Sequence, residues 1–163
     1  MADFYLKKND SKNKIEDSEQ LCLSLCQSAN EFFSASLYLR DKLDLFLVAI
    51  SNCAFCCELY LKAILVGYGV DYKNKALIDD SHNLERLFNL LPIREREYIS
   101  NHISLENKSE FNLLLHENGN AFIVVRYACE RKDITVDYRF LFLFADILKY
   151  VIECLLKESH FAL

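Results

Sequence analysis

Glycine and proline are scarce in this sequence: its 163 residues include three Gly and one Pro, and there is no Trp. A fold rich in β-sheet needs many tight turns, and glycine and proline are the residues that form such turns most readily. Their scarcity argues against an all-β fold and predicts long helices joined by polar loops. Apolar residues make up 52% of the chain, which is enough for one domain of this length to bury a core.

The chain also lacks an excess of basic residues: 19 Lys and Arg stand against 24 Asp and Glu, for a net charge of −5. A broad basic surface for duplex DNA is therefore not expected. The longest uncharged run, 45–57, ends at Glu58, whereas a membrane-spanning helix needs about 20 apolar residues. Residues 1–13 are polar and charged and do not resemble a signal peptide. We expect a cytoplasmic protein that does not associate with a membrane.

The seven cysteines are an odd number, and several lie within apolar segments. Buried reduced thiols pack like small hydrophobic side chains, and a reducing compartment suits them better than a disulfide framework. Cys22 and Cys26 are four residues apart, as are Cys53 and Cys57, so each pair can share a helix face. Two such faces can in principle build a four-thiolate zinc site, but the neighbours are apolar and the usual turn spacing is absent. Core packing is favoured, with neither a metal ion nor a cofactor expected.

Hydrophobic periodicity divides the chain into helices and short polar connections. Residues 1–16 are polar and are predicted to be a mobile arm, 17–158 a single helical domain and 159–163 a tail. The domain is predicted to be all-α, an up-and-down helical bundle with two long central helices and several short ones. The expected helices cover 17–39, 43–66, 82–91, 92–102, a short segment around 111–115, 121–130 and 137–158.

Two of the expected helices, 43–66 and 137–158, are apolar around most of their circumference. A surface helix of a monomer normally has a wide polar face, so each of these helices needs either a central position or a partner. Two interpretations stay open: both helices are central within one chain, or one of them forms a homodimer interface.

Charged residues within apolar segments are the candidate ligand-binding residues. Glu58 and Lys62 are four residues apart in the order that favours an ion pair on a helix, and at a surface such a pair contributes little stability. Arg126 directly follows the apolar run 122–125, and Glu130 lies four residues later. An arginine at the edge of a core usually has a specific partner. Arg126 is therefore predicted either to form a structural buried ion pair or to bind a ligand.

Three segments resemble the HEPN family, named for nucleotide binding in higher eukaryotes and prokaryotes. Segment 54–65 contains ELYLKAIL, segment 81–91 contains HNLERLFNLL, and segment 121–130 has the form F-x3-R-Y-x2-E. They follow the family's order, and the resemblance covers most of the chain. It implies an α-helical bundle that commonly dimerises and that binds nucleotides, RNA or protein partners.

Many HEPN proteins are metal-independent ribonucleases of toxin–antitoxin or defence systems, with an R-x(4–6)-H motif before the last long helix. Arg126 matches that arginine, but 131–133 are Arg-Lys-Asp and supply no histidine. Arg96 and His102 satisfy the same spacing, although they lie one or two helices too early. The resemblance therefore implies a domain that is not a competent ribonuclease.

The favoured hypothesis is a HEPN-like regulatory domain that binds a nucleotide, RNA or a protein partner. In it Arg126 grips a phosphate through its planar guanidinium group, and Glu58 orients Arg126 or Lys62. The implied partners are a second copy of the chain and RNA, a nucleotide or an antitoxin-like protein, in a bacterial toxin–antitoxin or defence system. The residues expected to line the binding groove are Arg126, Glu130, Glu58, Lys62 and His82.

Two alternatives remain open. In the first, the protein is a metal-independent ribonuclease in which Arg126 stabilises the transition state and Glu130, His82 or His102 transfers the proton. In the second, it is a purely structural interaction protein. That alternative predicts that Arg126 is sealed in an ion pair with no open pocket beside it.

Overall fold

The computed structural model describes residues 2–73, 81–103, 108–130, 133 and 135–158. Every secondary-structure element in this part of the chain is a helix or a helical turn, with no strand, so the all-α prediction is confirmed. The elements are α1 (Ala2–Leu39), the 3-10 turn η1 (Leu43–Leu45), α2 (Phe46–Gly67), α3 (Leu84–Asn89), α4 (Ile93–His102), α5 (Lys108–Glu117), α6 (Ala121–Arg126), the 3-10 turn η2 (Ala128–Glu130) and α7 (Tyr138–Glu158).

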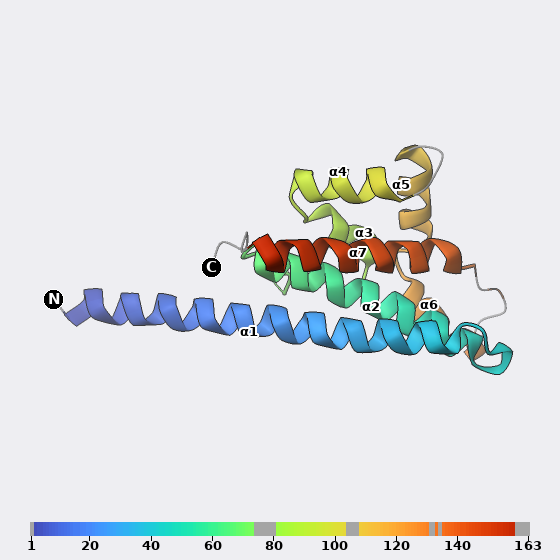
Figure 1. Ribbon diagram of the computed structural model, residues 1–163, viewed down its shortest axis with the longest axis horizontal. Helices are drawn as coiled ribbons and strands as arrows, with labels where there is room; N and C mark the ends of the chain where they lie inside the picture. The colour runs from blue at the N-terminus through green and yellow to red at the C-terminus, as the bar shows by residue number, and fades with distance from the viewer. Residues whose placement is uncertain (1, 74–80, 104–107, 131–132, 134, 159–163) are drawn as a thin grey trace.

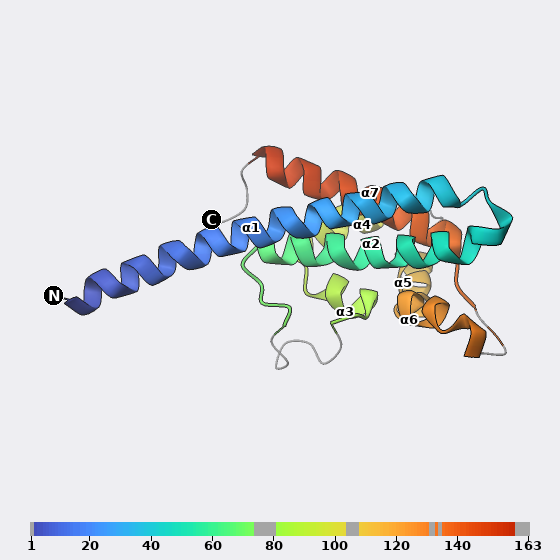
Figure 2. The same cartoon turned by 90° about the horizontal axis from the view of Figure 1, so that it is seen from below.

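The three long helices lie side by side. Helix α1 runs antiparallel to α2, and α7 packs on α2 in the same direction as α2 (Figures 1 and 2). The short helices α4 and α5 lie on the opposite side of α2 and α7 from α1 (Figure 1). The N-terminal part of α1 extends beyond the other helices in both views.

Helix α1 is longer than predicted. Segment 1–16 was expected to be a mobile arm, but α1 begins at Ala2 and runs without a break to Leu39. This segment contains neither glycine nor proline, the two residues that oppose a helix most strongly. Polarity by itself therefore does not end the helix.

Helix α2 is the central helix of the fold. Every residue from Cys56 to Gly67 is buried, and α2 packs against α1, α3, α6 and α7. Helix α7 differs, since Phe140, Leu141 and Phe144 are buried whereas Leu143 and Tyr150 are about half exposed. Packing within the chain therefore accounts for the apolar circumference of the second half of α2, whereas Leu47 and Val48 near its start are about half exposed and α7 keeps a partly exposed side.

Residues Leu43–Gly67 are long and apolar enough, by length and composition, to cross a membrane, and half of their most apolar window is buried inside the protein. The prediction from the sequence considered only the uncharged run that ends at Glu58. The mean hydropathy of a longer segment stays high even though it includes the charged residues Glu58 and Lys62. A helix at the centre of a helical protein has the same apolar composition, and α2 occupies that position here.

A network of backbone and amide hydrogen bonds joins the start of α3 to the corner between α5 and α6. The Asn83 side chain accepts a bond from the Arg86 N–H (3.0 Å) and thereby caps α3. The Leu84 N–H donates to the Gly119 carbonyl (2.8 Å). A Cβ atom on Gly119 would lie 2.9 Å from Asn83 Nδ2, so a larger residue here would displace the Asn83 side chain from its capping position. Asn120 is the residue before α6, but its side chain accepts a bond from Asn83 (3.1 Å) and does not cap α6.

Four phenylalanine rings hold the short helices on the long ones. Phe111 of α5 is fully buried, and its ring centroid lies 5.3 Å from Phe88 of α3 and 5.9 Å from Phe140 of α7. Phe144, one turn further along α7, lies 6.1 Å from Phe111. Aromatic pairs at these separations contribute packing energy in addition to burial, so Phe111 is the main anchor of α5.

Candidate functional site

Three of the five predicted site residues form one group. The Lys62 Nζ atom donates a hydrogen bond to Glu58 Oε1 at 2.6 Å, and His82 Nδ1 lies 3.0 Å from the same oxygen. Glu58 and Lys62 lie one turn apart on α2, and His82 lies just before α3. The side chains of Glu58 and Lys62 are 1% and 9% exposed, whereas His82 is 56% exposed. Glu58 and Lys62 therefore form a buried ion pair and not an exposed one, with His82 as its link to solvent.

A tyrosine ring lies beside this ion pair. The Lys62 ammonium lies 5.1 Å from the centroid of the Tyr72 ring, within the range of a cation–π contact. Burial, and then the negative charges of Asp71 and Glu58, raise the pKa of the Tyr72 hydroxyl. Glu58 Oε2 is buried and has no hydrogen-bond partner in the described part of the chain. The carboxylate therefore depends on the contacts of its other oxygen.

Arg126 and Glu130 are not part of this group. Both are exposed, and across residues 2–73, 81–103, 108–130, 133 and 135–158 no ion pair joins either of them to Glu58 or Lys62. The guanidinium carbon of Arg126 lies 6.0 Å from the Phe122 ring and 5.5 Å from the Tyr127 ring. The five-residue groove is therefore not formed, and Arg126 is not sealed in an ion pair either. The cause is that α6 ends at Arg126, where the side chain points to solvent.

The arginine and the histidine of the R-x(5)-H spacing on α4 also lie apart. His102 stacks on Tyr98, with ring centroids 3.9 Å apart and an angle of 18° between the planes. Arg96, six residues earlier on α4, instead lines a pocket with Phe88 of α3 and Asn112 of α5. The R-x(5)-H spacing on α4 therefore places its arginine and histidine on different sides of the helix. His82, bonded to Glu58, is remote in the sequence from both.

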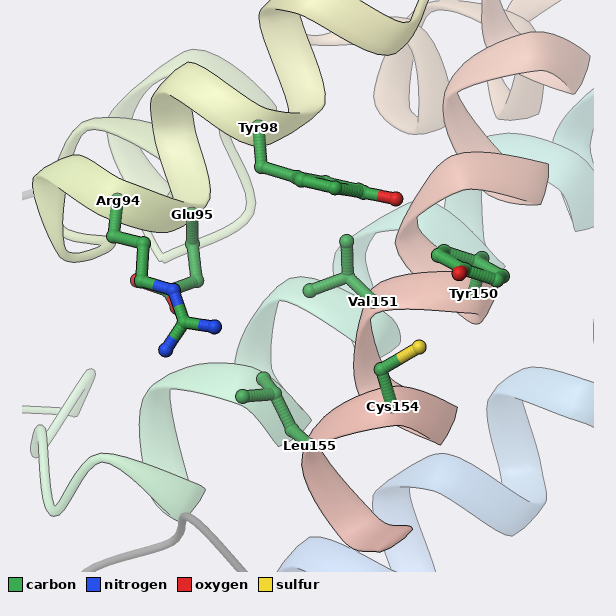
Figure 3. Close-up of a pocket in the computed structure, with 7 residues that line it drawn as sticks. All are labelled: Arg94, Glu95, Tyr98, Tyr150, Val151, Cys154 and Leu155. Atoms are coloured by element: carbon green, nitrogen blue, oxygen red, sulfur yellow. The ribbon is translucent and has the colours of Figure 1, made fainter. Parts of the chain in front are cut away.

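A second candidate site, which the sequence prediction missed, lies between α4 and α7 (Figure 3). It is a cavity of about 180 Å³, and we call it the tyrosine pocket. Tyr98 projects from α4 toward α7, where Tyr150 lies beside it (Figure 3). Their ring planes are 12° apart and their centroids are separated by 6.2 Å. The residues that line the pocket are Arg94, Glu95, Tyr98, Tyr150, Val151, Cys154 and Leu155.

The polar groups of the tyrosine pocket are held in place by neighbours. Glu95 is buried and accepts a hydrogen bond of 2.7 Å from the Tyr68 hydroxyl. Arg94 lies 4.0 Å from Glu95 Oε1, and its side chain is 72% exposed, so the guanidinium group remains accessible at the mouth. Hydrogen bonds with Cys154 and then with Tyr98 raise the pKa of the Tyr150 hydroxyl to about 12. The pocket thus combines aromatic walls, a fixed carboxylate and one accessible cation.

The cysteines pack in the core, as favoured, and the four-thiolate arrangement that was possible in principle is not formed among the described residues. The Cys22 thiol donates to the Ala63 carbonyl at 3.3 Å, and burial raises its pKa to about 11. The thiols that meet are those of Cys53, Cys56 and Cys57, all on α2. Hydrogen bonds from Cys56 and then Cys57 lower the pKa of the Cys53 thiol to about 5, while burial raises the pKa of the other two. Cys22 and Cys26 do not belong to this group.

The structure thus contains two candidate sites: a buried ion pair linked to solvent and an aromatic pocket. Comparisons with protein-family models, with curated proteins and with solved structures give no match to this chain.

Proposed function

We propose that this chain is a HEPN-like, noncatalytic regulatory domain that binds a nucleotide, with the base in the tyrosine pocket. One observation carries the proposal: the nearly parallel rings of Tyr98 and Tyr150 line the same pocket as the accessible guanidinium group of Arg94, and the ring of His102 stacks on Tyr98. Flat aromatic surfaces stack well on nucleobases, and arginine binds phosphate through its planar fork. The resemblance of segments 54–65, 81–91 and 121–130 to a nucleotide-binding family supports the same ligand class.

The size of the cavity and the net charge of the protein favour a nucleotide over a long polynucleotide. A cavity of about 180 Å³ is smaller than the roughly 300–1,000 Å³ of pockets that enclose a whole drug-sized ligand. It suits the base, with the ribose and phosphates outside it near Arg94. The net charge of −5 opposes the many phosphate contacts that drive polynucleotide binding.

Calorimetric titration tests this proposal: the purified chain is titrated with ATP, ADP and AMP. We expect saturable binding, and we expect Tyr98→Ala to weaken it about fivefold or more, because a base–aromatic stack contributes about 1–3 kcal/mol. Tyr98→Phe, which keeps the ring, should bind like the wild type. Tyr38→Ala is the matched control, since Tyr38 is 71% exposed on α1, away from the pocket residues.

Two further variants separate this pocket from the site that the sequence predicts. Arg94→Ala should weaken the triphosphate more than the monophosphate, whereas Arg126→Ala should leave both affinities unchanged. Loss of binding in Arg126→Ala alone would place the ligand at α6 and refute the pocket. Absence of binding at millimolar nucleotide would refute the proposal as a whole. Incubation with RNA and EDTA checks the ribonuclease alternative, and we expect no cleavage that Arg126→Ala abolishes.

We also propose that the chain forms a homodimer through the apolar end formed by η1 and the start of α2. Leu43 is 94% exposed, and Leu47 and Val48 are about half exposed. A symmetric dimer brings the same patch of two copies together, and this buries side chains that an isolated chain leaves in water. Sedimentation velocity at micromolar concentrations should show a dimer that Leu43→Asp converts to monomer. Leu113→Asp, at an exposed leucine of α5, should remain dimeric, and a monomeric wild type would contradict the proposal.

The cellular setting that we propose is the cytoplasm. Cys22, Cys26, Cys53, Cys56 and Cys57 are buried free thiols, and a reducing compartment preserves such thiols.

A further inference from the structure

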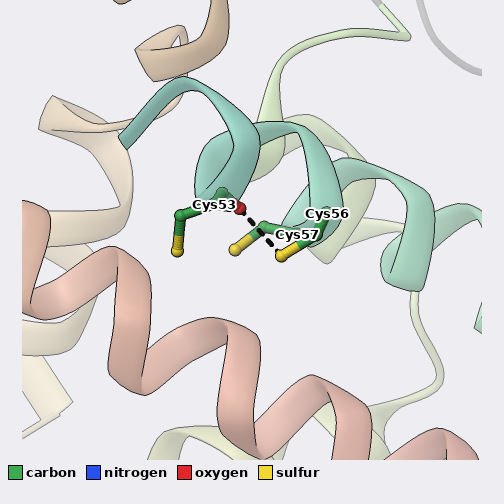
Figure 4. A group of neighbouring side chains, drawn as sticks. All are labelled: Cys53, Cys56 and Cys57. Atoms are coloured by element: carbon green, nitrogen blue, oxygen red, sulfur yellow. Dashed lines mark hydrogen bonds between the residues drawn. The ribbon is translucent and has the colours of Figure 1, made fainter. Parts of the chain in front are cut away.

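Three buried sulfur atoms meet on one face of α2. Cys53, Cys56 and Cys57 have no solvent-exposed surface, and their Sγ atoms all lie within 4.8 Å of one another. Positions three and four residues apart share a helix face, so the spacing of the three cysteines places them together. Figure 4 shows the three side chains on the side of α2 that faces α7. We call these residues the thiol cluster.

The contacts of the thiol cluster are weak ones that a bound ion can replace. The Cys56 thiol donates to the Cys53 carbonyl at 3.0 Å (Figure 4), and the Cys57 thiol donates to the Leu141 carbonyl of α7 at 3.6 Å. Thiols are weak donors, so little hydrogen-bond energy is lost when their protons leave. The sulfur lone pairs are then available as ligands.

The spacing of the sulfur atoms suits a metal ion between them. For three atoms at most 4.8 Å apart, some point lies within about 2.8 Å of all three, close to a metal–thiolate bond of about 2.3 Å. Small rotations about the Cα–Cβ bonds of Cys53, Cys56 and Cys57 close the difference. Because all three residues lie on one rigid, buried helix, their backbone positions need not change.

We propose that Cys53, Cys56 and Cys57 bind one Cu(I) ion through three sulfur ligands. Thiolates select soft ions such as Cu(I) and Zn(II) over Mg(II) or Ca(II). Zinc sites in proteins are almost always four-coordinate, and within the described residues the cluster offers three ligand side chains. Cu(I), in contrast, is commonly coordinated by two or three sulfur atoms. Binding forms Cu–S bonds, releases one proton for each thiol that becomes a thiolate, and transfers no electron.

Burial determines how the ion enters. The cluster has no solvent-exposed surface and is covered by α7 through the contact of Cys57 with Leu141. Copper therefore loads when α7 is separated from α2, so the experiment includes refolding in the presence of the ion.

The test uses the full chain, reduced and kept free of oxygen. Protein is refolded with Cu(I) and then challenged with excess bicinchoninate, a chelator whose copper complex is coloured. We expect one copper per chain to be withheld from the chelator, and X-ray absorption to show three sulfur neighbours. Zn(II) in equal amount should not displace it. Complete transfer of copper to the chelator, fewer than three sulfur neighbours, or displacement by zinc would overturn the proposal.

Variants of the cysteines assign the site. Loss of a hydrogen-bonding neighbour of a metal ligand costs about 10–100-fold in affinity, so Cys53→Ser, Cys56→Ser and Cys57→Ser should each lose at least that much. Cys26→Ser is the matched control, because Cys26 is buried on α1 outside the cluster, and it should bind like the wild type. Equal loss in Cys26→Ser would overturn the assignment. Circular dichroism shows which variants fold, and X-ray absorption of the wild type decides the question if a cluster variant does not.

Discussion

Lys62→Ala is expected to lower the free energy of unfolding by about 3–5 kcal/mol, because it leaves a buried carboxylate without its main partner. The Lys62 ammonium lies 2.6 Å from Glu58 Oε1, and the Glu58 side chain is 1% exposed. With Glu58 Oε2 unpartnered among the described residues, only the His82 contact at 3.0 Å remains to that carboxylate. Urea denaturation, followed by circular dichroism, measures the change.

The pair Lys149–Glu153 on α7 is the matched control for this prediction. It has the same four-residue spacing, but its atoms are 3.9 Å apart and its side chains are 39% and 44% exposed. Exposed pairs contribute about 0–1 kcal/mol, so Lys149→Ala should change stability by no more than that. An equal effect of Lys62→Ala and Lys149→Ala would show that burial of the first pair is unimportant.

A double variant separates the cost of an unpaired charge from the value of the pair. Replacement of a buried ion pair by apolar residues of similar volume is often neutral or stabilising. Glu58→Leu combined with Lys62→Met should therefore be markedly more stable than Lys62→Ala alone. If the double variant is as unstable as Lys62→Ala, shape and not charge governs this site.

Phe111→Ala is expected to destabilise the protein by about 3–5 kcal/mol, the range for removal of a buried phenylalanine ring. Phe111 is fully buried and meets rings of α3 and α7 at 5.3–6.1 Å. Two residues further along the same helix, Leu113 is 56% exposed, so Leu113→Ala should change stability by only about 0.5 kcal/mol. Thermal unfolding of both variants compares them, and similar melting temperatures would contradict the role of Phe111 as the anchor of α5.

Helices α2 and α7 were predictable because their signals are local. Helix α2 was expected over 43–66 and is found at Phe46–Gly67, after a 3-10 turn. Helix α7 was expected over 137–158 and is found at Tyr138–Glu158. The end of α2 is also marked in the sequence by a glycine: Gly69 has a φ of 70°, in the left-handed region that glycine adopts without strain.

The exposure of Arg126 could not be predicted from the apolar residues that precede it in the sequence. Its position after four apolar residues suggested a place at the edge of the core, but successive helical residues point about 100° apart. Val125 is buried while Arg126, the next residue, is exposed. In a helix of six residues the direction of each side chain depends on how the helix is seated, which periodicity over so short a segment does not determine.

The tyrosine pocket and the thiol cluster differ in how much of each can be predicted from the sequence. Tyr98 and Tyr150 are distant in the chain and meet only because α4 packs on α7; no local pattern signals such a contact. The spacing of Cys53, Cys56 and Cys57, in contrast, places them on one face of any helix. What the sequence does not reveal is which helices cover those sulfur atoms: Leu141 of α7 contacts Cys57, and Ser36 of α1 contacts Cys53.

The contact between the Cys57 thiol and the Leu141 carbonyl spans 84 positions of the chain, and this sets an order of events during synthesis. Helices α1 and α2 are synthesised before α7, and a domain folds as a unit. Until α7 docks, the side of Cys57 that meets the Leu141 carbonyl is uncovered. The last helix to be made is therefore the one that closes the thiol cluster.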